Sequence, residues 1–208
     1  MSTGGSSNQA GGGSSQRLAP PGEGYYRFLR YGHILSSLLR ELLEERFLGE
    51  LSTHPLTRAQ FCFLKLITLN VDLQIGEVAR CLGVTPAASS KTIDKLEMLG
   101  LVTRTDSPDD RRVTVLKATH AGRRLVRDFE ELKAERLWPV IDALGEDRRQ
   151  QLCELLEEVC INILDQEKML NRTCMRCAGY FHADCSVGRL YGECGLKDQR
   201  QLSSDGKA

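Results

Sequence analysis

The sequence has no excess of charge of either sign, since 28 Lys and Arg residues balance 28 Asp and Glu residues. Any nucleic acid must therefore bind a local basic face rather than a uniformly basic surface. No apolar run approaches the roughly 18 residues that a membrane-spanning helix needs. The Gly/Ser/Gln-rich N-terminus also lacks the apolar core of a signal peptide. These absences predict a cytoplasmic protein without a membrane partner.

The sequence also lacks the motifs that mark common catalytic sites. It contains no Gly-rich phosphate-binding loop, no Gly-x-Ser-x-Gly nucleophile turn and no His-Glu-x-x-His helix. Its glutamate clusters have helical spacing, which is typical of solvent-exposed helix faces. We therefore predict a protein that is not an enzyme.

Composition divides the chain into four parts. Residues 1–22 are rich in Gly and Ser and contain too little apolar surface to order themselves, so we expect disorder there. Apolar residues recur with helical spacing over 23–52 and again over 120–171, and both stripes are wide for lone surface helices. The segment 53–119 lies between these two helical regions, and residues 172–208 form a cysteine-rich tail.

The capping residues of the central segment predict its first two helices. Thr57 is an expected N-cap for a helix that continues to about Asn70. A short helix over Ile75–Leu82 follows, and Gly83 is expected to end it because glycine adopts a left-handed conformation without a Cβ penalty. The residues of the first helix that we expect to face inward are Phe61, Leu64, Leu66 and Ile67.

A third helix, which begins after an expected N-cap at Thr85 and continues to Leu99, has two different faces. Pro86 stands at N1, where a missing amide proton is harmless. The inward face is expected to combine Leu82, Val84, Ile93, Leu96 and Leu99. The opposite side carries Pro86, Ala87, Ser89, Ser90, Lys91, Asp94 and Lys95. Small residues at the start of this side allow the backbone to approach base edges, and the lysines reach phosphates.

A charged hairpin follows this helix. β-Branched residues in Leu101–Thr105 and Val113–Ala118 flank a loop of Asp, Pro and Arg, which favours two strands. Helix, turn, helix and hairpin in this order predict a winged helix-turn-helix. The expected fold class is therefore mainly α with a small β-hairpin, a winged helix-turn-helix over 53–119 with a helical dimerisation region outside it.

The hairpin tip carries the residues that could reach into a groove of DNA. Arg111 and Arg112 lie there, and a guanidinium can enter a narrow minor groove, where the negative potential is concentrated. Asp110 would repel phosphate, so we expect it to orient an arginine through a bidentate pair. The alternative is a solvated turn whose charges only protect the edge of the hairpin from aggregation.

Long helices are also expected after the hairpin. Thr119 is the expected N-cap of a helix that begins near Ala121, and Pro139 should kink or end it. A last helix is expected over Glu146–Leu170. Wide apolar helices at both ends of the chain predict a homodimer, which would place two recognition helices roughly 34 Å apart on an inverted repeat.

The stretch from Ile75 to Leu125 resembles the DNA-binding half of the multiple-antibiotic-resistance regulator (MarR) family of winged-helix repressors. The resemblance lies in LGVTPAASSKTIDKLEMLGLVTR, then SPDDRR, then Thr119-x-x-Gly122, and the Asp-Arg-Arg wing is its specific part. The flanking helices extend it to Tyr25–Leu170, where they match the dimerisation elements of the family. It implies a homodimer that binds double-stranded DNA. Members of the family often bind a small aromatic effector between the dimer helices and the winged domain; the alternative for this chain is a filled core with no effector pocket.

The resemblance also implies roles for particular residues. It places Lys91 and Lys95 with Ser90 at major-groove positions, Arg112 on the wing-tip arginine and Asp110 on the aspartate that orients it. The sequence departs from the family pattern at Ser89 and Thr92, where the family usually has apolar residues, and at Ala118, where it usually has leucine. The full set of expected DNA-binding residues is Thr85, Pro86, Ala87, Ser89, Ser90, Lys91, Lys95, Arg104, Asp110, Arg111 and Arg112.

The cysteines form two groups. Those of the tail could supply four thiolates to Zn²⁺ or to an iron–sulfur cluster, or could act as a thiol–disulfide switch. The expected metal ligands are Cys174, Cys177, Cys185 and Cys194, with His182 as an alternative ligand. The remaining four, Cys62, Cys81, Cys153 and Cys160, are expected to be small buried hydrophobic residues.

These features together predict a homodimeric, sequence-specific transcriptional regulator, acting as a repressor and modulated by a metal, a redox state or a small effector. The alternative is a metal-stabilised protein–protein interaction module with a degenerate winged helix. The basic residues distinguish the two functions, because a degenerate domain has no reason to keep Lys91, Lys95, Arg111 and Arg112 on one face.

Overall fold

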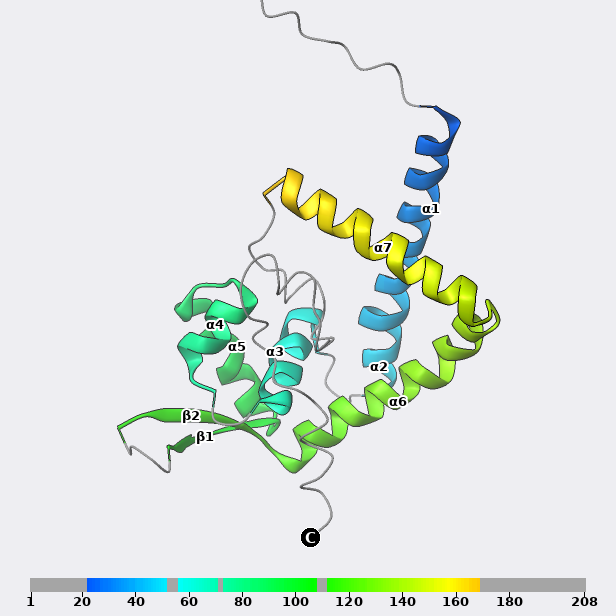
Figure 1. The fold of residues 1–208 in the computed structure, drawn as a ribbon. Coiled ribbons are helices and arrows are strands. Elements are labelled where there is room, and N and C mark those ends of the chain that lie inside the picture. The colour runs from blue at the N-terminus through cyan, green and yellow to red at the C-terminus, as the bar shows by residue number, and fades with distance from the viewer. Residues whose placement is uncertain (1–21, 52–55, 71–72, 108–111, 169–208) are drawn as a thin grey trace, which may run out of the picture. The chain divides into compact units, whose positions relative to one another are not determined.

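The computed structural model describes residues 22–51, 56–70, 73–107 and 112–168 (Figure 1). They fold mainly into helices, with one two-stranded antiparallel sheet, which confirms the predicted fold class. The chain divides into one compact unit that ends at Leu38 and a second that begins at Leu39. Among the described helices, none has the length and apolar character that crossing a membrane requires.

The helices and strands follow the predicted order, with boundaries that differ by a few residues. They are α1 (Glu23–Arg40), a π-helical segment η1 (Glu41–Phe47), α2 (Leu48–Leu51), α3 (Arg58–Leu69), α4 (Ile75–Leu82), α5 (Pro86–Met98), β1 (Val102–Asp106), β2 (Thr114–Ala118), α6 (His120–Asp142) and α7 (Glu146–Gln166). The apolar stripe that begins at Tyr25 is thus divided among three helical elements. The wider turns of η1 change the face presented by the residues after them, and Phe47 and Leu48 are both buried.

Capping hydrogen bonds fix the starts of three helices where the sequence predicts them. In each case a threonine hydroxyl accepts from the backbone N–H three residues later, which satisfies a donor that has no partner within the helix. The pairs are Thr57 with Gln60 at 3.3 Å, Thr85 with Ala88 at 3.2 Å and Thr119 with Gly122 at 3.0 Å. Gly83 ends α4 with φ = 63°, the left-handed conformation expected of it.

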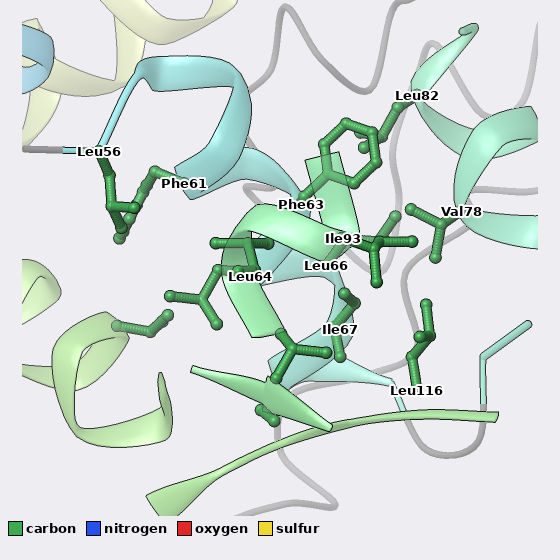
Figure 2. Close-up of a cluster of buried hydrophobic side chains, with 14 of the residues drawn as sticks. Leu56, Phe61, Phe63, Leu64, Leu66, Ile67, Val78, Leu82, Ile93 and Leu116 are labelled. Atoms are coloured by element: carbon green, nitrogen blue, oxygen red, sulfur yellow. The ribbon is translucent and has the colours of Figure 1, made fainter. Parts of the chain in front are cut away.

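A single apolar cluster holds α3, α4, α5 and the hairpin together (Figure 2). Leu64 of α3, Val78 of α4, Ile93 of α5 and Leu116 of β2 are all completely buried. Each buried aliphatic side chain of this kind stabilises the fold by roughly 2 kcal/mol relative to an exposed one. The residues predicted to face inward on α3 and α5 belong to this cluster or pack against it, which confirms those two inward faces. The same packing holds α5 in place against α3 and the hairpin.

The hairpin is anchored at one end and exposed at the other. The strands pair from Val102 with Ala118 to Asp106 with Thr114, one residue later than predicted at the start of each strand. Val102 and Ala118 are buried, and the N–H of Leu116 donates to the carbonyl of Leu73 at 2.8 Å. The tip-side residues are exposed, so the hairpin projects from the core as a wing.

Helix α6 begins against the backbone that leads into β1. The Thr119 hydroxyl donates to the carbonyl of Gly100 at 2.7 Å, and the Thr119 N–H donates to that of Leu101 at 3.0 Å. A Cβ atom on Gly122 would lie 2.2 Å from the Leu101 carbonyl oxygen and 3.0 Å from a methyl carbon of Leu64. Only glycine allows this approach, which explains the Thr-x-x-Gly spacing physically.

An ion pair and an aromatic contact join α6 to α3. Lys65 donates to the Glu130 carboxylate at 2.7 Å, and Lys133 donates to the same carboxylate. The Phe61 and Phe129 ring centroids are 4.4 Å apart. Burial opposes ionisation of Glu130, but the charge of Lys65 and the hydrogen bonds from both lysines outweigh it and lower the pKa of Glu130.

The structure tests two expectations about the C-terminal helices. Pro139 does not end α6, which continues to Asp142, so a kink is the alternative that stays a prediction; the missing proline N–H costs one hydrogen bond near an end that is mostly exposed. Cys153 and Cys160 are exposed rather than buried, because α7 contains no buried residue. The other two cysteines agree better with the expectation of burial, since Cys62 is buried and Cys81 is half-buried. Burial raises the pKa of the Cys81 thiol.

The close approach at Gly122 predicts a specific stability effect. Gly122→Ala should lower the free energy of unfolding by about 2 kcal/mol, because backbone must move to accommodate the methyl group. Gly76→Ala is the matched control, since a Cβ atom there meets nothing within 4 Å. It should stabilise α4 by about 0.5 kcal/mol. Urea denaturation of both variants measures this, and equal stabilities would contradict the packing described.

The ion pair predicts a pH dependence. Because the pKa of Glu130 in the folded protein lies below its ordinary value of 4.5, the pair stabilises the fold above that pH. This contribution is lost as the pH falls through the lower folded value. Glu130→Gln should lower the free energy of unfolding by about 2 kcal/mol at neutral pH. This loss is smaller than that for breaking a fully buried ion pair, because Glu130 is partly exposed to solvent. The difference from the wild type should shrink below about pH 4 in urea titrations, whereas a constant difference would exclude the charge effect.

Candidate nucleic-acid interface

Helix α5 has one face in the core and one in solvent. Ile93 and Leu96 are completely buried, which fixes the rotation of the helix about its axis. Residues three and four apart lie on one side of a helix, so the opposite side is continuous. That exposed side carries Thr85, Pro86, Ala87 and Ala88 at its start and Lys91 and Lys95 farther along. Ala88 joins this side although the sequence analysis did not select it, and the same helical spacing could have identified it.

The structure contradicts the expectation that Ser89 faces DNA. Ser89 is completely buried, and its hydroxyl donates to the carbonyl of Ile75 at 3.3 Å, which joins α5 to α4. The residue lies four positions before Ile93, so it belongs to the inward stripe and takes the place of an apolar residue there. Ser90 is half-buried. Thr92 is half-buried as well, and its hydroxyl donates to the carbonyl of Ala88 at 3.0 Å.

The two lysines of α5 give its exposed side a positive charge. Lys91 and Lys95 are both exposed, and in the part of the chain that the structure describes neither forms an ion pair. They are four residues apart and therefore lie on the same side of the helix, about one turn from each other. Both ammonium groups are available to an anion.

The wing places a further arginine near the hairpin tip. The N–H of Ser107 donates to the carbonyl of Val113 at 2.7 Å and closes the end of the hairpin. Arg112 is exposed directly before this closure. Asp110 and Arg111 lie outside the described residues, so the expected pairing of Asp110 with an arginine stays a prediction.

Arg104, expected to bind DNA, is engaged with α5. Its guanidinium donates to Asp94 at 2.5 Å and also to Glu97, and its backbone N–H lies 3.4 Å from the Glu97 carboxylate. Hydrogen bonding to Asp94 raises the pKa of Arg104 further above its ordinary value. Glu97 thus belongs to the site, although it is not among the residues predicted from the sequence. Its spacing of three from Asp94 puts both carboxylates on one side of α5, which is the signal that could have revealed the pair.

The expected metal ligands Cys174, Cys177, Cys185 and Cys194, and the alternative ligand His182, lie outside the described residues. Within residues 22–51, 56–70, 73–107 and 112–168, no three His, Cys, Asp or Glu side chains gather closely enough to hold a metal ion.

Comparison with known proteins agrees with this geometry. Residues 54–113 match the model of the MarR family. The HTH-type transcriptional regulator MhqR of Bacillus subtilis is 28% identical over 109 residues, which cover 52% of this chain and 75% of that protein. The HTH-type transcriptional regulator FarR of Neisseria gonorrhoeae is 28% identical over 120 residues, which cover 58% of this chain and 82% of that protein.

Solved structures share the fold. FabT of Streptococcus pneumoniae, crystallised in complex with DNA, has a TM-score of 0.57 at 20% identity, over 67% of this chain and 99% of that one. The transcriptional repressor CouR, bound to a 23-mer DNA duplex, has a TM-score of 0.51 at 29% identity, over 66% and 96%. A degenerate winged helix that serves only protein binding is not favoured. Residues 54–113 are thus similar to the MarR family, and the described residues share the winged-helix fold of these solved structures.

Proposed function

We propose that the protein binds an inverted repeat in double-stranded DNA as a homodimer and represses transcription there. The observation that carries this proposal is the exposed side of α5, where Lys91 and Lys95 stand without ion pairs among the described residues. The similarity to CouR, a transcriptional repressor bound to a DNA duplex, supports repression rather than activation.

Helix α5 has the dimensions and the surface of a recognition helix. Its 13 residues make it about 20 Å long, which suits the major groove. Ala87 and Ala88 at its start are small, so the backbone can come close to base edges. Lys91 and Lys95 would bind phosphates on the flanks of the groove and position the helix.

The wing would read the adjacent minor groove. Arg112 is exposed near the tip of a hairpin whose base is buried, so the hairpin that carries it is anchored to the same core as α5. A guanidinium in a narrow minor groove gains from the concentrated negative potential of the phosphates. We propose that Arg111 binds phosphate nearby and that Asp110 orients the wing-tip arginine.

The apolar surface of the outer helices supports a homodimer. Helices α1 and α7 contain no buried residue, although both carry many large apolar side chains. In α1, Tyr26 is 61% exposed and Leu38 is 48% exposed; in α7, Leu155 is 61% exposed. On each of these helices taken by itself, many large exposed apolar side chains are typical of an interaction site. A second copy of the chain is the occupant that we propose, because a two-fold dimer also supplies the second recognition helix for an inverted repeat.

Modulation of DNA binding is part of the same proposal. A small aromatic effector between the dimer helices and the winged domain would change the spacing of the two recognition helices. Zinc, an iron–sulfur cluster or a thiol switch at the tail cysteines would give a second input. Resemblance supports the effector, and the spacing of the cysteines supports the metal or redox input.

The basic residues predict two distinct effects on DNA binding. With a duplex that the wild-type protein selects from a randomised pool, Arg112→Ala should weaken binding about tenfold without loss of folding. Lys91→Gln should weaken binding to all duplexes and reduce the slope of log K against log salt by about 0.9. Arg148→Ala, at an exposed position of α7, is the charge-matched control. Fluorescence anisotropy at several salt concentrations measures all three, and wild-type behaviour of both Arg112→Ala and Lys91→Gln would contradict the interface.

The apolar helices predict the oligomeric state. The wild-type protein should have twice the 23.2 kDa mass of the chain in light scattering. Leu38→Glu places a charge in the apolar surface of α1 and should produce a monomer, because burying an unpaired charge in the interface has a large desolvation free energy. Arg27→Glu, at an exposed polar position of the same helix, should remain a dimer. A wild-type monomer, or a dimer unaffected by Leu38→Glu, would exclude α1 as the interface.

A further inference from the structure

Arg104 links the two elements that are proposed to read DNA. It lies on β1, opposite Leu116 in the hairpin register, and its side chain extends to α5. One terminal nitrogen is 2.5 Å from a carboxylate oxygen of Asp94, and the other donates to Glu97. The backbone N–H of the same residue also points to Glu97, at 3.4 Å. A single residue therefore contacts α5 through both its side chain and its backbone.

These contacts contribute little to the stability of the fold. The Asp94 side chain is 53% exposed and that of Glu97 is 37% exposed, and ion pairs this exposed contribute between about 0 and 1 kcal/mol. Their effect is on geometry. The planar guanidinium offers its donors in a fixed fork, so holding two carboxylates at once restricts the direction of the strand relative to the helix.

Arg104 also changes the charge of the recognition helix. Helix α5 contains two lysines, Lys91 and Lys95, and two carboxylates, so its side chains have no net charge. The guanidinium binds both carboxylates and leaves the two lysines as the uncompensated charges on that helix. Without Arg104, two unpaired carboxylates would face solvent on an element that must approach phosphate.

We propose that Arg104 is a positioning residue for DNA recognition and not a DNA contact: it fixes the wing relative to α5 by binding Asp94 and Glu97. The proposal rests on the proposed function, because it concerns how the two reading elements are held in register. A wing that pivots on its base would carry Arg112 away from the groove while α5 stays in place. Loss of the link should therefore lower sequence discrimination more than overall affinity for DNA.

The test compares two ways of breaking the link. Arg104→Gln removes the guanidinium. The double variant Asp94→Asn with Glu97→Gln removes both carboxylates. Circular dichroism checks that each variant is folded. Each protein is titrated against the duplex selected by the wild type and against a scrambled duplex of equal length at one salt concentration. Arg124→Gln is the matched control, an exposed arginine on α6 that pairs with Asp128.

Both ways of breaking the link should lower the ratio of affinities for the selected and the scrambled duplex about tenfold; Arg104→Gln should also weaken binding to both duplexes, because it leaves two carboxylates unpaired. The result for the carboxylate variant is decisive, because deleting two negative charges without a positioning effect would strengthen binding to both duplexes alike. An unchanged ratio in this variant, or equal weakening on both duplexes by Arg104→Gln, would overturn the proposal.

Hydrogen exchange separates this inference from the proposed function. In the DNA-free protein, Arg104→Gln should speed amide exchange in β1 and β2 while the exchange of α3 stays unchanged. Unchanged exchange in the hairpin would overturn the positioning role whatever the DNA result. A wild-type protein that selects no duplex would overturn the proposed function, and the exchange experiment would still decide whether Arg104 holds the wing.

Discussion

The rest of the structure depends on the burial of one apolar cluster around α3. Leu64, Ile93 and Leu116 come from three different elements and are all completely buried, so helix α5 and the hairpin pack on the same support. This burial fixes which side of α5 faces solvent. It also holds the base of the wing, through Val102 and the hydrogen bond from Leu116 to Leu73. The surface proposed to read DNA is thus a consequence of how the core is packed.

The charged residues at this surface have two different roles. Lys91 and Lys95 are exposed and meet no carboxylate among the described residues, so their charge is available to phosphate. The charge of Arg104, in contrast, is neutralised, because its guanidinium forms ion pairs with Asp94 and Glu97. A count of basic residues on the recognition helix and the wing would treat all three alike. The structure distinguishes exposed lysines without ion pairs among the described residues from an arginine that is held by two carboxylates.

Local sequence signals predicted much of this fold. The helix starts at Thr57, Thr85 and Thr119 were predictable because a threonine hydroxyl accepts a hydrogen bond from the backbone N–H three residues later. The helix end at Gly83 was predictable because few residues other than glycine adopt positive φ. Ser89 was assigned to the wrong face because its polarity was given more weight than its helical position. The spacing of Asp94 and Glu97 places both carboxylates on one side of α5, but their link to Arg104 could not be predicted, because the position of β1 against α5 depends on tertiary packing. The exposure of Cys153 depends on what covers α7, which a helical period does not reveal.

The central claim is that two copies of α5 and two wings read an inverted repeat. Hydroxyl-radical footprinting of the wild-type protein on the duplex it selects tests this most directly. We expect a two-fold symmetric footprint, with protected half-sites whose centres lie about 10 base pairs, one helical turn, apart. Protection of a single half-site, or uniform protection without a selected sequence, would contradict it.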